Sequence, residues 1–136
     1  MIKKTITYKD FNGAERTEDF YFHLSKTELM EMELSVNNGL SEYMQLIVDA
    51  KDGKQIMAVT KDVILKSYGE KSMDGRFFDK SEILSNRFYN SPAYDVLFTE
   101  LVTDAVASAE FFKGIMPEDL DEFAAKTNRQ SVAPAK

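Results

Sequence analysis

The chain of 136 residues has no cysteine, one histidine and only three prolines. The absence of cysteine excludes a disulfide framework, a thiolate metal site and a cysteine nucleophile. A zinc site or a general base needs histidine with suitably spaced partners, so a single histidine argues against both. His23 falls on the polar face at the end of a predicted strand, and we expect it to face solvent.

The sequence also lacks basic clusters and long apolar runs. Its formal net charge is −6, its pI is about 4.8, and its Lys and Arg residues are scattered among acids. Nucleic acid is therefore not expected as a partner, because phosphate contacts need clustered basic side chains. No apolar run is long enough to span a bilayer, and the first five residues lack the apolar core of a signal peptide. We expect a cytoplasmic protein that does not contact membranes.

Recognised catalytic and cofactor motifs are missing as well. The chain has no Gly-rich phosphate loop, no nucleophile elbow and no His-Glu metalloprotease helix. Carboxylate pairs such as Glu31 with Glu33, and the acidic stretch 118–122, fall on predicted helices and are typical of solvated faces. The sequence therefore predicts neither an enzyme nor a bound cofactor.

Residues 70–81 partly match a calcium-binding loop. With Gly75 at the sixth position, oxygen ligands stand at the first, third and fifth positions: Glu70, Ser72 and Asp74. The twelfth position, which needs a bidentate Glu, is then Ser81, and Glu82 comes one residue late. We therefore expect an ordinary Asp-Gly turn and no metal site.

What the sequence does contain is a change of hydrophobic period within residues 19–33. Up to Leu24 apolar and polar residues alternate, as in a half-buried strand, and from Ser25 the spacing becomes helical. Ser25 and Glu28 are spaced for a capping box, and Leu24 and Leu29 for a hydrophobic staple. This pattern predicts a strand followed almost directly by a helix.

The strand before this junction, from Arg16 to Leu24, has a predicted partner over residues 3–8. The two alternating stretches are separated by Asn12-Gly13, a pair that favours turns. A lone hairpin is marginally stable in water. Helices are therefore expected to cover its aromatic face, which comprises Tyr8, Phe20 and Phe22.

Helix signals fill the rest of the chain. The first helix is expected to end near Ser35. Further helices are expected over residues 40–50, 54–68, 79–88, 91–107 (or, with a bend, to 113) and 117–126. Asp79 with Glu82 resembles a capping box, and Gly69 resembles a residue that ends a helix. The last ten residues have Val132 as their only large apolar side chain.

Together these patterns predict an α+β fold. An N-terminal β-hairpin, residues 3–24, is followed by a mainly α-helical bundle of five or six helices, residues 25–126. We expect a single globular domain, residues 1–126, and a disordered C-terminal tail, residues 127–136.

A group of apolar side chains in the last third allows two interpretations. The group consists of Phe111, Phe112, Ile115 and Met116. Core packing is the simpler one, since burying a Phe is worth about 2–3 kcal/mol. The alternative is an exposed patch that binds a partner, in a chain with 7 methionines that adapt to varied surfaces. These four are therefore the candidate partner-binding residues.

Several stretches resemble the tail assembly chaperones of long-tailed, siphovirus-type phages of Gram-positive bacteria. The most specific are Arg16-Thr-Glu-Asp-Phe-Tyr-Phe22 and Ser67-Tyr-Gly-Glu-Lys-Ser72. The similarity continues through residues 4–8, 24–31, 64–66, 74–76, 91–94 and 114–117, and spans most of the chain from residue 3 to about 123.

The resemblance implies a non-enzymatic protein that binds the tape measure protein, keeps it soluble and assists tail tube assembly. It implies action in the host cell cytoplasm and absence from the mature virion. We also expect a homo-oligomer, and contact with the major tail protein through a longer, frameshifted form. The alternative is a structural component of a phage tail or capsid, which would assemble through sheet edges; a small hydrolase is a more distant third.

Overall fold

The computed structural model describes residues 1–31 and 53–117. In chain order the elements are β1 (Ile2–Lys9), β2 (Glu15–Phe22), α1 (Lys26–Glu31), α3 (Gly53–Ser67), β3 (Tyr68–Lys71), β4 (Phe78–Asp79), α4 (Glu82–Tyr89), α5 (Pro92–Thr103) and α6 (Ala105–Ile115). The protein is α+β with an N-terminal antiparallel strand pair, as predicted. In these two parts of the chain, no helix is long and apolar enough to cross a membrane.

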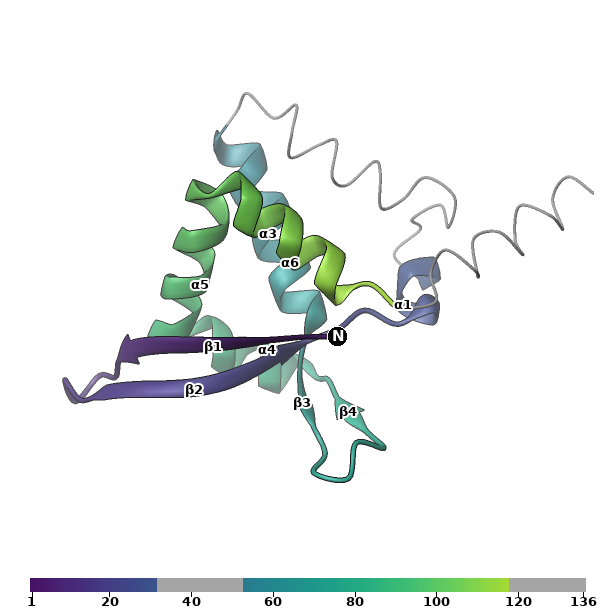
Figure 1. The fold of residues 1–136 in the computed structure, drawn as a ribbon, viewed down its shortest axis with the longest axis horizontal. Helices are drawn as coiled ribbons and strands as arrows, with labels where there is room; N and C mark the ends of the chain where they lie inside the picture. Colours follow the sequence, from purple (N-terminus) through teal and green to yellow (C-terminus); the bar gives the residue numbers. More distant parts are fainter. Residues whose placement is uncertain (32–52, 118–136) are drawn as a thin grey trace, which may run out of the picture.

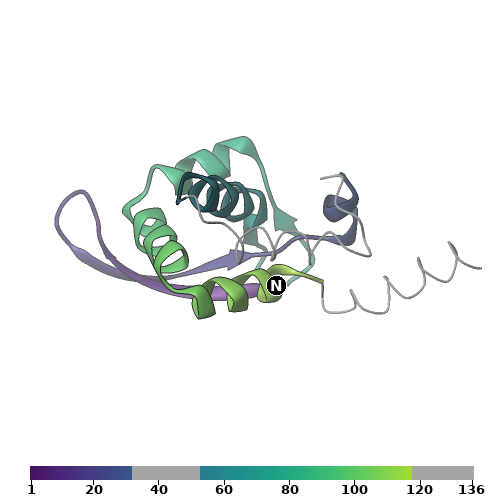
Figure 2. The same ribbon diagram turned by 90° about the horizontal axis from the view of Figure 1, so that it is seen from above.

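The strands form one antiparallel sheet in the order β1-β2-β3-β4. β1 and β2 pair along their full length, and Gly13 adopts a positive φ of 83° in the turn between them. The predicted Asn12-Gly13 hairpin is therefore confirmed. Helices α3, α4 and α5 gather over one face of the sheet, while the two hairpins reach beyond them (Figures 1 and 2).

The second hairpin, β3–β4, was not predicted: the sequence indicated an Asp-Gly turn within residues 70–81 but no strands on either side of it. Helix α3 ends at Ser67, and Tyr68 begins a strand instead of ending the helix. Gly69 lies inside β3, where a Cβ atom would come within 2.7 Å of the Asp79 carbonyl oxygen. Gly69 therefore permits close strand pairing and does not end a helix.

The core is built around the aromatic face of the first hairpin. Phe22 is 0% exposed. Its ring centroid lies 5.2–5.7 Å from three rings contributed by β3, α4 and α6, namely Tyr68, Phe88 and Phe111. The prediction that helices cover this face is confirmed.

The strand-to-helix junction also follows the prediction. The amide of Ser25 donates to Glu28 Oε1 at 2.9 Å, and the amide of Glu28 donates to Ser25 Oγ at 3.1 Å. Leu24 and Leu29 are both buried. The reciprocal bonds satisfy amides that the first turn of α1 would leave open.

Two other helix starts differ from the predictions. Asp79 belongs to β4, so the cap of α4 is Ser81, whose Oγ accepts from the amide of Leu84 at 3.1 Å. The long helix predicted from Ser91 is divided at Asp104, whose carboxylate accepts from the amides of Val106 and Ala107 in the first turn of α6. Both cap residues have an extended backbone, so α4 begins only after Ser81, and at Asp104 the helix that hydrophobic spacing alone would continue is interrupted.

Some predictions lie outside the described residues. These are the end of the first helix near Ser35, the helices over residues 40–50 and 117–126, the domain boundary at 126 and the tail 127–136. They stay predictions.

The junction leads to a stability prediction. Phe22→Ala should lower the free energy of unfolding by about 3–5 kcal/mol, because it leaves a cavity among three rings. Ser25→Ala should cost about 1 kcal/mol, the usual value of an N-cap. Denaturant melts measure both, and Phe11→Ala is the control, since Phe11 is 84% exposed in the hairpin turn. Similar losses for Phe22→Ala and Phe11→Ala would contradict the assigned core.

Candidate functional site

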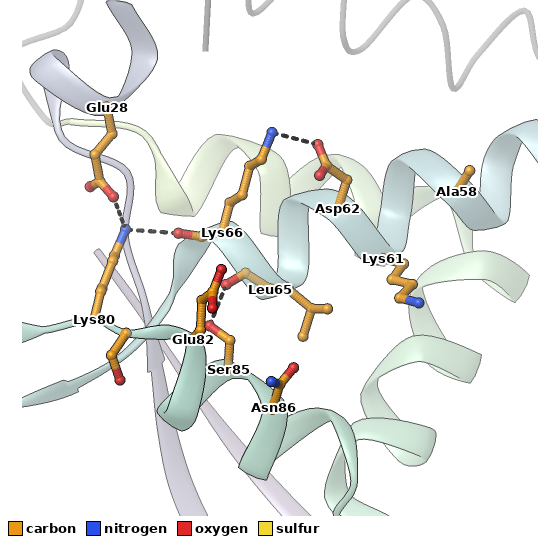
Figure 3. A pocket seen from close by; sticks show the side chains of 11 residues that line it. Glu28, Ala58, Lys61, Asp62, Leu65, Lys66, Lys80, Glu82, Ser85 and Asn86 are labelled. Carbon is orange, nitrogen blue, oxygen red and sulfur yellow. Dashed lines mark hydrogen bonds and ion pairs between the residues drawn. The ribbon is translucent and has the colours of Figure 1, made fainter. Parts of the chain in front are cut away.

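A cleft opens between α3 and α4, beside the start of α4 (Figure 3). We call it the trough, and its volume is about 750 Å³. Its lining comes from α1, α3, α4 and the two residues before α4: Glu28, Ala58, Lys61, Asp62, Leu65, Lys66, Lys80, Ser81, Glu82, Ser85 and Asn86.

Helical spacing explains which side chains reach the trough. On α3 its lining residues recur three and four positions apart, from Ala58 to Leu65, and therefore share one face. On α4 the same spacing brings Glu82, Ser85 and Asn86 to the facing side. The Ser85 hydroxyl donates to the Leu65 carbonyl at 3.0 Å and joins the two helices across the floor.

Lys80 closes one end of the trough (Figure 3). Its ammonium donates to Glu28 Oε2 at 2.6 Å, to the Lys66 carbonyl at 2.9 Å and to the His23 carbonyl. An ammonium has three donors, and all three are used here. Lys80 therefore ties the end of β2, the first turn of α1 and the end of α3 to the strand that precedes α4.

The Glu28 carboxyl carries the clearest electrostatic signature of this end. Partial burial alone would raise its pKa, but hydrogen bonds from Lys80 and from the Ser25 amide outweigh burial and lower the pKa below 4.5. Burial lowers the pKa of the Lys80 ammonium, although Glu28 opposes that shift. The 2.6 Å contact with Glu28 and the two carbonyl acceptors fit a charged Lys80 ammonium. We therefore use the lowered pKa of Glu28 to predict how stability depends on pH.

Other charges of the trough are also paired within the protein. Lys66 Nζ lies 3.1 Å from Asp62 Oδ2, and Lys61 Nζ lies 4.4 Å from the centre of the Tyr89 ring. The result is a recess with a small apolar floor, Ala58 and Leu65, between charges of both signs.

The four candidate partner-binding residues lie elsewhere, in the core. Phe111, Phe112 and Ile115 are at most 2% exposed and Met116 is 7% exposed. The face of α6 that carries them packs toward the first hairpin, and the Ile115 carbonyl accepts from the Leu24 amide at 2.8 Å. Core packing, the simpler of the two interpretations, is what the structure shows. Contact between these four residues and a partner stays a prediction. Because they are buried, such contact would require a change of structure that exposes them.

His23 also differs from its expected position. It is half-buried, with its ring 6.3 Å from that of Phe78 in an edge-on arrangement, and its amide donates to the Ser67 carbonyl at 2.8 Å. The cause is the second hairpin: β3 pairs with β2, and Phe78 of β4 brings its ring against His23 on the side expected to face solvent.

Residues 70–81, which partly match a calcium-binding loop, contain the β3–β4 turn. Ser72 Oγ accepts from the Phe77 amide, and Asp74 Oδ1 accepts from the Arg76 amide, at 3.0 Å each. Two of the oxygens considered as ligands are thus engaged within the turn. Over residues 1–31 and 53–117, no group of three or more His, Asp or Glu side chains is placed to hold a metal ion.

The same turn carries apolar side chains that the sequence analysis did not single out. Met73 is fully exposed and Phe77 is 57% exposed. The sequence does show one apolar residue before Asp74-Gly75 and one after it, and a turn at this pair places both at the end of a hairpin. Because the flanking strands were not predicted, this pattern alone indicated only a turn.

These features describe a small α+β protein with a recess between two helices and a projecting hairpin whose turn exposes two apolar side chains. The model of the phage tail assembly chaperone family matches residues 1–136, and the protein belongs to that family. Comparisons with curated proteins and with solved structures gave no significant match.

The Lys80–Glu28 pair leads to a prediction on pH. The folded pKa of Glu28 is lowered, so the stability it contributes is present above about pH 4.5 and lost as the pH falls through the folded value. At neutral pH, Glu28→Gln should cost about 1 kcal/mol, because Gln still accepts from Ser25 but carries no charge. Thermal melts at neutral pH and at about pH 3 should show the gap between wild type and variant closing. A gap that stays constant would mean that the pair contributes nothing.

Burial on α6 generates a second prediction. Phe112→Asp should abolish cooperative folding or lower stability by several kcal/mol, because it buries an unpaired charge in the core. Val106→Asp is the matched control, since Val106 is on the same helix and 68% exposed, and should change stability by about 0.5 kcal/mol or less. If Phe112→Asp melted like the control, the assigned orientation of α6 would be wrong.

Proposed function

We propose that this protein binds the tape measure protein during phage tail assembly, keeps it soluble and is left out of the finished virion. The observation that carries the proposal is the family match along the whole chain. The physical need is simple: a long helical protein exposes apolar stripes until it is enclosed, and a soluble cover prevents its aggregation.

The net charge suits this task. A charge of −6 on 136 residues keeps the protein, and a complex that it coats, soluble by mutual repulsion. We further propose that several copies act together as a homo-oligomer in the host cytoplasm. In this proposal a longer, frameshifted form of the same protein contacts the major tail protein.

The alternative of a structural tail or capsid component is less well supported by the sheet. Sheet-built tubes assemble through open strand edges. Here one edge strand, β4, has two residues, and the other, β1, carries Lys3, Lys4 and Lys9. Short edges and edge lysines both disfavour pairing with another sheet. The edges of this sheet therefore favour a chaperone over a tube component.

Co-expression tests the proposal. The tape measure protein of the same phage should gain soluble yield several-fold when co-expressed with this protein, and the two should co-purify. The exposed-site variant Val106→Asp should retain the effect, while an unrelated acidic protein of similar size should not have it. If the wild-type protein neither solubilises nor co-purifies with the tape measure protein, the proposed function is wrong.

A further inference from the structure

The first hairpin contains a stretch of strand that is paired on one side only. β2 pairs with β1 along its full length, but on its other side it pairs with β3 only at Tyr21 and Phe22. In an antiparallel sheet, every second residue of a strand directs its N–H and C=O groups to the same side. Within residues 15–20, every second residue therefore directs these groups away from β1, where no strand of the described ranges, 1–31 and 53–117, lies beside it. We call this side of residues 15–20 the open edge.

The side chains along the open edge are exposed. Every side chain from Glu15 to Asp19 is exposed, on both faces of the hairpin, and only Phe20 is half-buried. This part of the hairpin reaches beyond the helices (Figures 1 and 2). An exposed row of unpaired N–H and C=O groups is a template on which another strand can form.

The hairpin that carries the open edge is ordered by side-chain bonds between its two strands. Thr5 Oγ1 donates to Asp19 Oδ1 at 2.6 Å. Near the turn, Arg16 Nε donates to Asp10 Oδ2 at 2.7 Å. Because these bonds fix β2 in place before any partner arrives, a strand that pairs with it would lose little free energy in ordering it.

The charges of residues 15–20 determine which strand can pair there. Three acidic side chains and one basic side chain give this stretch a formal charge of −2: Glu15, Glu18, Asp19 and Arg16. The one basic group is already bound within the hairpin, to Asp10. Two such acidic edges repel each other, which disfavours pairing between the open edges of two copies, whereas a strand with basic side chains is attracted.

The end of the open edge next to β3 is acidic as well. Burial raises the pKa of the Tyr68 phenol, and the carboxylates of Glu70 and Glu18 raise it further, while Arg87 opposes the shift. Glu18 belongs to β2 and Glu70 to β3, so carboxylates from both strands act at the corner where β3 leaves β2. A basic strand along residues 15–20 would be attracted by both.

We propose that the open edge binds an extended segment of a partner protein that carries Lys or Arg at alternate positions, and that this segment joins the sheet as a strand beside β2. Backbone hydrogen bonds supply the affinity. Basic side chains of the segment pair with Glu15 and Asp19, which share one face of β2, and supply the specificity. The inference goes beyond the proposed function, whose client is helical, and does not rest on it.

Peptide binding to the full chain tests the inference. The probe is a short synthetic peptide in which Lys alternates with Thr and Val. One control peptide has Glu in place of Lys. A second control keeps the Lys residues but has Pro at the other positions, which removes half of its N–H groups and holds it away from strand geometry. Hydrogen exchange of individual backbone amides, followed by NMR, is the measurement.

In the free protein, the amides of residues 15–20 should alternate between slow exchange, where they bond to β1, and fast exchange, where they point to the open edge. The Lys peptide at saturation should slow the fast set at least about tenfold, because those amides then donate to the added strand. Neither control peptide should change it.

Two variants of the full chain test the role of charge. Glu15→Lys should weaken binding of the Lys peptide at least about threefold, because it replaces an attractive charge with a repulsive one. Glu110→Lys is the matched control: it makes the same change of charge at an exposed position of α6 and should bind the peptide like wild type. Circular dichroism melts verify that each variant folds.

Several outcomes would overturn this inference. If the Lys peptide does not slow the fast set, or the Pro peptide slows it equally, no strand is added at the open edge. If these amides are already slow in dilute free protein, the edge is covered within its own chain. If they become slow only as the protein concentration rises, the occupant is a second copy. None of these measurements uses the tape measure protein, so failure here leaves the proposed function untouched.

Discussion

The burial of one face of the β1–β2 hairpin is the constraint on which the rest of the structure depends. Phe22, at 0% exposure, contacts rings from β3, α4 and α6. Two strands cannot bury an aromatic face between themselves, so elements distant in sequence must supply the cover. Each of the three rings fixes the element that carries it, so the positions of the second hairpin, α4 and α6 follow from this packing.

A polar contact complements the apolar one. Lys80 binds the carbonyls of His23 and Lys66 and the carboxylate of Glu28, and so joins four segments where the aromatic cluster ends. The Lys80 side chain also closes one end of the trough. A contact that stabilises the fold therefore also shapes the candidate site. The recess is lined by three basic and three acidic side chains, so its formal charges balance.

The division between core and surface shapes the functional picture. The apolar residues of α6 from Phe111 to Met116 are used in covering the hairpin, so they are not available as an open docking patch. Exposed apolar side chains lie elsewhere, among them Met73 and Phe77 in the β3–β4 turn, Phe11 in the turn of the first hairpin and Val106 near the start of α6. For a member of the phage tail assembly chaperone family, whose partners are tail proteins, the second hairpin and the trough are therefore further candidates for contacts beside the buried group on α6.

Local signals in the sequence determined the first hairpin, the Ser25 cap and the span of α3, because alternation, capping and helical period act between near neighbours. Separately, particular stretches, above all residues 16–22 and 67–72, resemble the family. Only the tertiary structure decided that β3 joins β2, that Phe112 is core and that Lys80 reaches Glu28, 52 residues away in the chain. Those contacts depend on which surfaces meet once the chain is compact. A pattern of near neighbours does not indicate which distant surfaces will meet. The trough and the position of the second hairpin both depend on such distant contacts, so the sequence patterns did not predict them.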